Sequence, residues 1–415
     1  MGRAGRCRPD KTGAALPAGA PPLASPDATM KPSILIVGAG LYGAVCAREL
    51  HDAGHRVLVV EQRRAPGGNC ATRYVEEADC HEHVHGAHIF HTDSERLWAW
   101  VNRFARFNSY AHRVKVRHGG SLYSFPVNLF TLYQVFGATS PAEAQAALAR
   151  ERVAIDAPAN LEEHCLATVG PTLYRLFIEG YTRKQWHRHP SELPAEIIKR
   201  IPLRLDFNDN YFNDRWQGIP IGGYSALFDR LLAGVPVQFG VDFLPDAGHW
   251  LSRFDHVIHT GPIDAFFDHC HGRLEYRSLR FERELLPVAD HQGAAVVNYT
   301  DAAVPWTRVI EHRHFDLPSP GRRHGVSQTL ITREYPADAG PGQEPYYPVA
   351  TAANQARLAR YQALAEEAVP QVHFGGRLGG YRYLDMHQVI GAALAHVGRV
   401  VRGECHRNVA LDGTA

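Results

Sequence analysis

Three glycines, Gly38, Gly40 and Gly43, follow the first apolar run of the chain. The first glycine of such a set permits a tight turn, the second lets the backbone approach a pyrophosphate, and the third lets a helix pack closely on a strand. Glu61 ends the next apolar run, where a carboxylate can bind ribose hydroxyls. The pattern therefore predicts a dinucleotide site. Its expected members are Gly38, Gly40, Leu41, Tyr42, Gly43, Glu61 and Gln62.

Two further glycine-rich stretches bear on which dinucleotide binds. Gly67 and Gly68 follow Glu61 closely, with Asn69 next, and a glycine pair there lets a loop run beside the cofactor. Far along the chain, FGGRLGGYRYLDMHQ (374–388) offers another glycine-lined backbone. Each stretch alone could be a structural turn. Together they favour FAD over NAD, with Gly68 and Asn69 in the cofactor site.

A histidine-rich stretch, HEHVHGAHIFH (81–91), raises the possibility of a metal site because imidazole ligands often cluster. No carboxylate or cysteine completes a ligand set at clear spacing, and Gly86 interrupts a helical placement. We therefore expect no metal. Two interpretations stay open: a loop of mixed exposure, or His88 and His91 lying against the flavin, with an N–H donating to its ring.

Five basic residues lie around one tyrosine and one tryptophan in GYTRKQWHRHP (180–190). Lys and Arg (44) nearly balance Asp and Glu (43) over the 415 residues, which argues against a nucleic-acid partner, since such proteins need a basic excess. We expect Tyr181 and Trp186 to face a ligand near a helix end. We expect Arg183, Lys184 and Arg188 to be solvated charges on its outer side.

The elements that must position these residues are an initial β-α-β unit, several helices, a β-rich region and a final β-α pair. Residues 33–62 read as strand, glycine turn, helix and strand. Helix starts are marked by Ser140 with Glu143 and by Asn160 with Glu163. Short β-prone runs between turns fill about 272–347. The predicted fold class is mixed α/β.

We expect a discontinuous Rossmann-like FAD-binding domain, a helical domain and a mainly antiparallel sheet domain, preceded by a disordered extension over residues 1–30. The predicted ranges are 31–107 with about 222–268 and about 357–403 for the FAD-binding domain, about 126–192 for the helical domain, and about 108–125, 193–221 and 269–356 for the sheet domain. The cleft between them should hold the ligand.

The composition points to the cytoplasm. Seven scattered cysteines without a CxxC pair argue against a disulfide scaffold or zinc ribbon. No apolar stretch is long enough to predict a transmembrane helix.

Eight longer motifs resemble those of bacterial UDP-galactopyranose mutases, in the same order along about 33–400. They are GAHIFHT (86–92), GYTRKQW (180–186), ELPAEIIKRIPLR (192–204), DNYFNDRWQGIPIGGY (209–224), YRSL (276–279), VPWTRVIEH (304–312), EPYYPV (344–349) and GGRLGGYRYLDMHQ (375–388).

The resemblance implies non-covalent FAD and interconversion of UDP-galactopyranose and UDP-galactofuranose without net redox change. The flavin must be reduced, by NAD(P)H or another reductant, and its N5 attacks the anomeric carbon as UDP leaves. This agrees with the absence of an evident Ser/His/Asp constellation in the sequence. The resemblance also suggests a homodimer or a higher homo-oligomer.

Site residues are carried over by position from the same motifs. Implied diphosphate ligands are Arg200, Arg308, Tyr211, Tyr347 and Tyr383; implied residues at the uridine end are Phe177, Tyr181, Trp186 and Phe212; implied neighbours of the nucleotide sugar are Arg277 and Asn298; and Glu334 and Asp385 lie beside the site. On the flavin side the resembling segment adds Arg377, Tyr383, Asp385 and Met386.

His112 departs from the resemblance, because the family usually has asparagine at this position near the sugar. Histidine is bulkier and can be charged, so a modified UDP-hexose is an alternative substrate. A second alternative is an amine-oxidase-like flavin oxidoreductase, for which an apolar substrate chamber is expected. A third is a flavin- or nucleotide-binding sensor without turnover.

Overall fold

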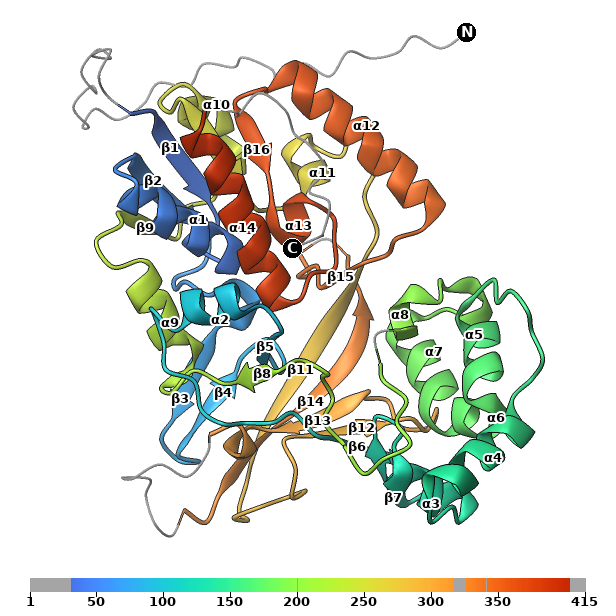
Figure 1. Ribbon diagram of the computed structural model, residues 1–415. Helices are drawn as coiled ribbons and strands as arrows, with labels where there is room; N and C mark the ends of the chain where they lie inside the picture. The colour runs from blue at the N-terminus through green and yellow to red at the C-terminus, as the bar shows by residue number, and fades with distance from the viewer. Residues whose placement is uncertain (1–30, 200, 317–325, 341, 404–415) are drawn as a thin grey trace, which may run out of the picture.

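The computed structural model describes residues 31–199, 201–316, 326–340 and 342–403 (Figure 1). The predicted extension (1–30) and Arg200 lie outside the described residues. No helix within the described ranges is long and apolar enough to cross a membrane.

A five-stranded parallel sheet carries the N-terminal β-α-β unit. Its strands, in spatial order, are β16 (Val372–Phe374), β10 (His256–His259), β1 (Ser33–Val37), β2 (Arg56–Glu61) and β9 (Val237–Phe239). Helices α1 (Leu41–Asp52) and α14 (Met386–Val401) pack together beside β1 (Figure 1). Strand β1 is apolar because it is covered on both faces, as parallel strands usually are. The predicted α/β class is confirmed.

The turn after β1 requires its glycines. Gly38 has a φ of +104°, a backbone conformation that residues other than glycine rarely adopt. A Cβ on Gly43 would lie 2.0 Å from the Gly38 carbonyl oxygen, so only glycine lets α1 pack this closely on β1. The geometry agrees with the sequence-based assignment of both positions.

A seven-stranded sheet forms the second half of the molecule. Its strands, in spatial order, are β15 (Tyr347–Pro348), β11 (Tyr276–Leu286), β14 (Thr329–Asp338), β13 (Arg308–Glu311), β12 (Val296–Tyr299), β6 (Val114–His118) and β7 (Ser121–Phe125). The pairing is antiparallel except between β12 and β6, which run parallel. The long strands β11 and β14 run side by side from near β15 and α13 (Gly376–Gly379), away from the parallel sheet (Figure 1).

Helices of residues 129–199 gather beside β12, β6 and β7 (Figure 1). They are α3 (Leu129–Phe136), α4 (Pro141–Glu151), α5 (Leu161–Thr168), α6 (Gly170–Leu173), a π-helical stretch (Tyr174–Glu179), α7 (Gly180–Trp186) and α8 (Glu196–Lys199). The predicted caps are present, since Ser140 Oγ accepts from the Glu143 N–H at 3.3 Å and Asn160 Oδ1 accepts from the Glu163 N–H at 2.9 Å. Each glutamate reaches one residue beyond the cap, to the N–H of Thr139 or of Ala159.

Shorter elements connect these layers. They are β3 (Thr72–Val75), β4 (Cys80–His83), β5 (Phe90–Thr92), α2 (Glu95–Val101), β8 (Trp216–Gly218), α9 (Gly223–Leu231), α10 (Ala247–Leu251), α11 (Ile263–Phe266), α12 (Ala352–Ala368) and α13 (Gly376–Gly379).

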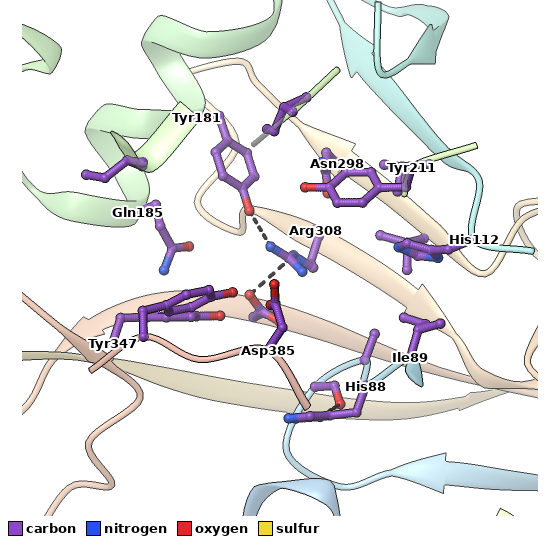
Figure 2. A pocket seen from close by; sticks show the side chains of 18 of the residues that line it. His88, Ile89, His112, Tyr181, Gln185, Tyr211, Asn298, Arg308, Tyr347 and Asp385 are labelled. Carbon is purple, nitrogen blue, oxygen red and sulfur yellow. Dashed lines mark hydrogen bonds and ion pairs between the residues drawn. The ribbon is translucent and has the colours of Figure 1, made fainter. Parts of the chain in front are cut away.

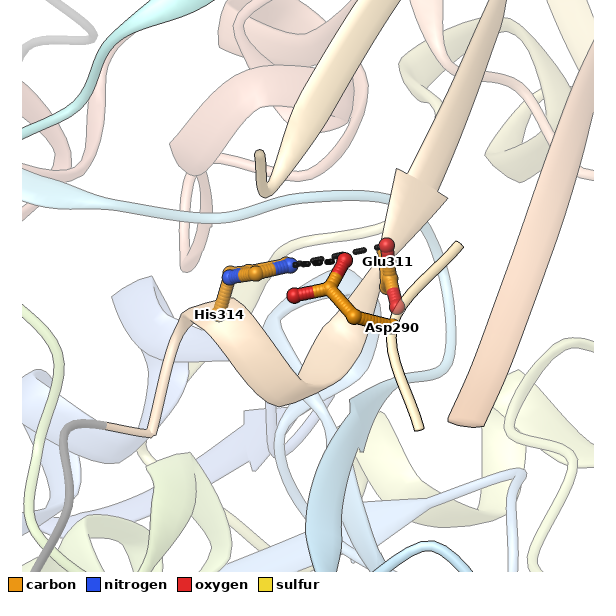
Figure 3. A group of neighbouring side chains, drawn as sticks. All are labelled: Asp290, Glu311 and His314. Carbon is orange, nitrogen blue, oxygen red and sulfur yellow. Dashed lines mark hydrogen bonds and ion pairs between the residues drawn. The ribbon is translucent and has the colours of Figure 1, made fainter. Parts of the chain in front are cut away.

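An ion-pair cluster closes the end of β13 (Figure 3). His314 Nε2 lies 3.2 Å from Asp290 Oδ1 and 3.5 Å from Glu311 Oε2. The Glu311 carboxylate is fully buried and also accepts from two backbone N–H groups and the Thr329 hydroxyl. The three side chains lie close enough together to hold a metal ion. A protonated imidazole between two carboxylates accounts for this spacing, because the hydrogen bond with Glu311 raises the pKa of His314.

This cluster predicts a pH-dependent stability. A histidine whose pKa is higher in the folded state stabilises the fold fully below its unfolded pKa of about 6.5, and the contribution is lost as pH rises through the folded pKa. Between about pH 6 and about pH 9, the melting temperature of the wild type should therefore fall relative to that of His314→Asn. Thermal unfolding across this range tests it, and parallel curves for the two proteins would contradict it.

Candidate functional site

Two adjoining cavities lie between the parallel sheet, the seven-stranded sheet and α7. The first runs along the glycine turn, and the second lies over the seven-stranded sheet. Four residues line both cavities: His88, Arg377, Leu384 and Met386. The two cavities are therefore neighbours with a common wall.

The first cavity has the walls of a dinucleotide site. The predicted residues that line it are Gly38, Gly40, Leu41, Tyr42, Gly43, Glu61, Gln62, Gly68, Asn69, His88, Arg377 and Met386. Glu61 is oriented by two backbone donors, the N–H of Ala39 to Oε2 at 2.7 Å and the N–H of Arg63 to Oε1 at 2.8 Å. Tyr383 and Asp385 line only the second of the two cavities.

The floor of the second cavity is one row of side chains across neighbouring strands. Asn298 on β12 is paired with Arg308 on β13, and Arg308 is paired with Glu334 on β14. Directly paired residues point to the same face of a sheet. The register of three successive strands thus brings these polar side chains to one cavity. Figure 2 shows Asn298 and Arg308 among the residues that line it.

Arg308 is the charged centre of this row. Its Nη2 donates to the Tyr181 hydroxyl at 2.5 Å, and its Nε lies 3.3 Å from Glu334 Oε1. Glu334 is 2% exposed, whereas the Arg308 side chain keeps 25% of its surface open. Burial opposes the charge of Arg308, but Glu334 outweighs it and holds the pKa of Arg308 above its ordinary value. The cavity therefore contains a permanent cation with room for an anionic ligand.

Several buried polar atoms on the cavity walls have no hydrogen-bond partner among the described residues. They are Gln185 Nε2 and Oε1, Asn298 Oδ1 and Arg377 Nε. Buried polar groups are nearly always paired in folded proteins. These atoms indicate a polar ligand, and they argue against the apolar chamber expected of an amine oxidase.

A stack of three rings forms the wall opposite Tyr347. Phe212 lies flat on His91, with centroids 3.7 Å apart, and stacks on His112 at 5.7 Å. His91 is anchored by its Nδ1, 2.7 Å from Asp214 Oδ2. His91 lines the second cavity and not the glycine-lined one, and its contact with a flavin stays a prediction.

His88 lies where the two cavities meet, and its hydrogen bond to the backbone decides which ring nitrogen carries the proton. Its Nδ1 is 2.9 Å from the Gly86 carbonyl oxygen, so Nδ1 carries the proton. Burial lowers the pKa of His88 to about 4, which leaves the ring neutral at pH 7. Nε2 is consequently an acceptor rather than a donor.

Aromatic side chains complete the second cavity. Tyr347 stacks on Tyr383 at 5.9 Å and lies 6.4 Å from the ring of Trp186. The predicted residues that line this cavity are His88, His91, His112, Phe177, Tyr181, Trp186, Tyr211, Phe212, Asn298, Arg308, Glu334, Tyr347, Tyr383 and Asp385, joined by Arg377 and Met386 from the cofactor side.

Two predicted residues are not placed there. Arg200 lies outside the described residues. Arg277 does not line either cavity; its Nε donates to the Gln185 carbonyl at 3.0 Å, and its guanidinium pairs with Asp338. Arg277 therefore supports the end of α7 instead of contacting a nucleotide sugar.

Sequence reasoning missed Gln185 and misplaced Lys184. Gln185 is one helical turn after Tyr181, and this spacing could have identified it. Lys184 was expected in solvent on the outer side, but its Nζ donates to three backbone carbonyls, those of Tyr299, Val304 and Trp306. The partners lie in a loop with no distinguishing sequence pattern, so the pattern of α7 alone could not reveal the contact.

The histidines of the 81–91 stretch have separate partners. His81 Nδ1 pairs with Asp316 at 3.0 Å, and His85 Nδ1 lies 3.0 Å from the Tyr346 hydroxyl. His83 packs against Phe315, with centroids 4.4 Å apart. Some histidines of this stretch therefore make structural contacts, whereas others line the cavities.

Comparisons with known proteins agree with this arrangement. The sequence model of the UDP-galactopyranose mutase family matches residues 176–383, and that of an NAD(P)-binding Rossmann-like domain matches residues 36–104. The chain is 41% identical over 366 residues to a probable UDP-galactopyranose mutase of Klebsiella pneumoniae, covering 87% of this chain and 93% of the relative.

A second relative and a solved structure are also similar to this chain. A dTDP-fucopyranose mutase of Escherichia coli is 37% identical over 374 residues, covering 87% of this chain and 96% of that protein. A crystal structure of reduced UDP-galactopyranose mutase superposes with a TM-score of 0.69 at 14% identity, covering 92% of this chain and 97% of that one, which shows the fold. The chain belongs to the UDP-galactopyranose mutase family, a family of isomerising enzymes.

Proposed function

We propose that this enzyme interconverts UDP-galactopyranose and UDP-galactofuranose without net redox change. The observation that carries the proposal is the Arg308 cation, held between Glu334 and Tyr181 in a polar cavity that adjoins the glycine-lined cavity. A nucleotide diphosphate attached to a sugar matches such a cavity, because it combines two negative charges with many hydrogen-bonding groups.

The glycine-lined cavity suits FAD. The close backbone approach at Gly40 and Gly68, where a Cβ on Gly68 would lie 3.1 Å from Gly40 Cα, leaves a wall free of side chains for a pyrophosphate. Glu61 is oriented to take ribose hydroxyls, and Arg377 offers an unpaired Nε. When bound and reduced, by NAD(P)H or another reductant, FAD supplies a nucleophilic ring nitrogen.

Arg308 would stabilise the departing diphosphate. As the bond between the sugar carbon and the diphosphate oxygen breaks, negative charge grows on the diphosphate, and a fixed guanidinium stabilises that charge without reorganising. Tyr181 orients Arg308 through a hydrogen bond, and Tyr347 lies on the same cavity. Burial raises the pKa of Tyr347, so its hydroxyl stays protonated and can donate to a phosphate oxygen. The role of Arg200 remains a prediction from the resemblance.

His112 would contribute a hydrogen-bond donor to the sugar. The buried Tyr110 hydroxyl lies 2.9 Å from His112 Nδ1 and has no other partner among the described residues. Donation from that hydroxyl to Nδ1 satisfies both groups, and it places the imidazole proton on Nε2. Burial lowers the pKa of His112 to about 3, so the ring is neutral and this tautomer persists near pH 7.

A modified hexose is the second candidate substrate. The relative named dTDP-fucopyranose mutase is nearly as similar as the UDP-galactopyranose mutase relative, so both the base and the sugar could differ here. His112 would then form its hydrogen bond with the hydroxyl groups of the modified sugar. The amine-oxidase alternative is less well supported, because its expected apolar chamber is occupied by Arg308, Glu334 and Asn298.

The direct test uses dithionite-reduced protein with UDP-galactofuranose, followed by chromatography for UDP-galactopyranose. Parallel reactions with dTDP-fucopyranose distinguish the two candidate substrates. Conversion of UDP-galactofuranose without consumption of reductant supports the proposal. If the reduced, flavin-loaded protein leaves both nucleotide sugars unchanged, the mutase activity is refuted.

Arg308→Ala tests the charged centre. Removal of a group that stabilises developing charge should lower kcat by on the order of 10²-fold or more, while the flavin absorbance spectrum stays that of wild type. Arg280→Ala is the matched control, because Arg280 lies on β11 of the same sheet with a largely exposed side chain. Equal turnover in the two variants would remove Arg308 from the catalytic residues.

His112→Phe in a Tyr110→Phe background tests the sugar contact. The pair keeps the ring stack on Phe212 and avoids leaving the Tyr110 hydroxyl unpaired. Loss of one donor to the substrate should lower kcat/KM by roughly 10-fold, and His112→Gln, which keeps an N–H donor, should retain more of it. Wild-type kcat/KM in the double variant would show that Nε2 does not contact the sugar.

A further inference from the structure

One face of α7 is held against the loop that joins β12 to β13. The Thr300 hydroxyl donates to the Leu176 carbonyl at 2.7 Å just before α7 begins. At Gly180 the two backbones are so close that a Cβ would lie 2.1 Å from the Thr300 carbonyl oxygen. One turn later, Lys184 reaches the same loop. The three contacts follow helical spacing, so they form a continuous seam.

Lys184 makes three of the hydrogen bonds in this seam. Its Nζ donates to the carbonyl oxygens of Tyr299 at 2.7 Å, Val304 at 3.0 Å and Trp306 at 3.0 Å. An ammonium has three N–H donors, and all three are used. Burial lowers the pKa of Lys184 to about 8, which agrees with a lysine whose hydration has been replaced by backbone carbonyls.

The seam joins the two walls that carry the charged centre. The neighbouring face of α7 presents Tyr181 and Gln185 to the cavity, and the loop held by Lys184 ends at Arg308. The hydrogen bond between Tyr181 and Arg308 bridges these two walls at 2.5 Å. Its geometry depends on how closely α7 sits on the loop.

We infer that Lys184 is a positioning residue for the site: it fixes the loop over 299–307 against α7 and thereby sets Tyr181 against Arg308. The lysine does not touch either cavity, so it acts through these two residues. The consequence for catalysis rests on the proposed function, whereas the restraint on the loop does not.

The restraint is tested by amide hydrogen exchange on the flavin-loaded full chain, without substrate. Lys184→Met keeps the length of the side chain but removes the three donors. Exchange over 299–307 should become at least 10-fold faster in Lys184→Met and stay near wild type in Arg183→Met. Arg183 is the matched control, because it is the preceding residue on α7, is 52% exposed and pairs with Glu179. Unchanged exchange in Lys184→Met would overturn the inference.

Two further variants distinguish loss of the seam from a general folding defect of Lys184→Met. Lys184→Arg keeps a cation with several donors and should restore part of the protection. Gly180→Ala leaves the lysine in place but forces α7 away from the loop, so it should speed exchange in the same segment. If Gly180→Ala and Lys184→Met loosened different segments, the seam would not be a single unit and the inference would fail.

The effect on the site is read from a double-mutant cycle for kcat/KM. If Lys184 works through Tyr181, the double variant Lys184→Met with Tyr181→Phe should lose little more than the worse single variant. Costs that multiply would show that Lys184 does not act through Tyr181. Because wild-type turnover is measured in the same cycle and exchange is measured without substrate, failure of the proposed function is distinguishable from failure of this inference.

Discussion

The ion pair between Arg308 and Glu334 is the constraint on which the site depends. Glu334 is almost completely buried, so without Arg308 it would be an uncompensated charge or a protonated acid. Arg308 uses one edge for Glu334 and Tyr181 and keeps another edge open to the cavity. A buried pair of this kind adds little net stability. Its value here is that it holds a cation rigidly beside a cofactor cavity.

The seven-stranded sheet makes that geometry possible. Asn298, Arg308 and Glu334 belong to three adjacent strands and stand in one row because of the strand register. A slip of one residue would turn each side chain to the other face. The long pairing of β11 with β14, from Arg277 to Leu286, makes such a slip costly. The site is therefore specified by sheet register on one side and by the seam between α7 and the β12–β13 loop on the other.

The sequence predicted some of this and could not predict the rest. The glycine turn and the caps at Ser140 and Asn160 are local, so each is readable from a few residues. The row of Asn298, Arg308 and Glu334 depends on the register of three strands, which the sequence does not show, and only the family resemblance placed these residues together. Lys184 was misread because its partners are backbone carbonyls, which every loop offers. Arg277 was misplaced for a related reason: its contact with Gln185 is also to a carbonyl.

The central claim is that Arg308 receives the diphosphate of a nucleotide sugar, and a crystal structure with UDP tests it most directly. The account predicts diphosphate oxygens at about 2.7–3.2 Å from the Arg308 guanidinium, with the Tyr347 hydroxyl donating to the same group. A UDP molecule whose diphosphate lies elsewhere, leaving the open edge of Arg308 without a phosphate oxygen, would contradict the account.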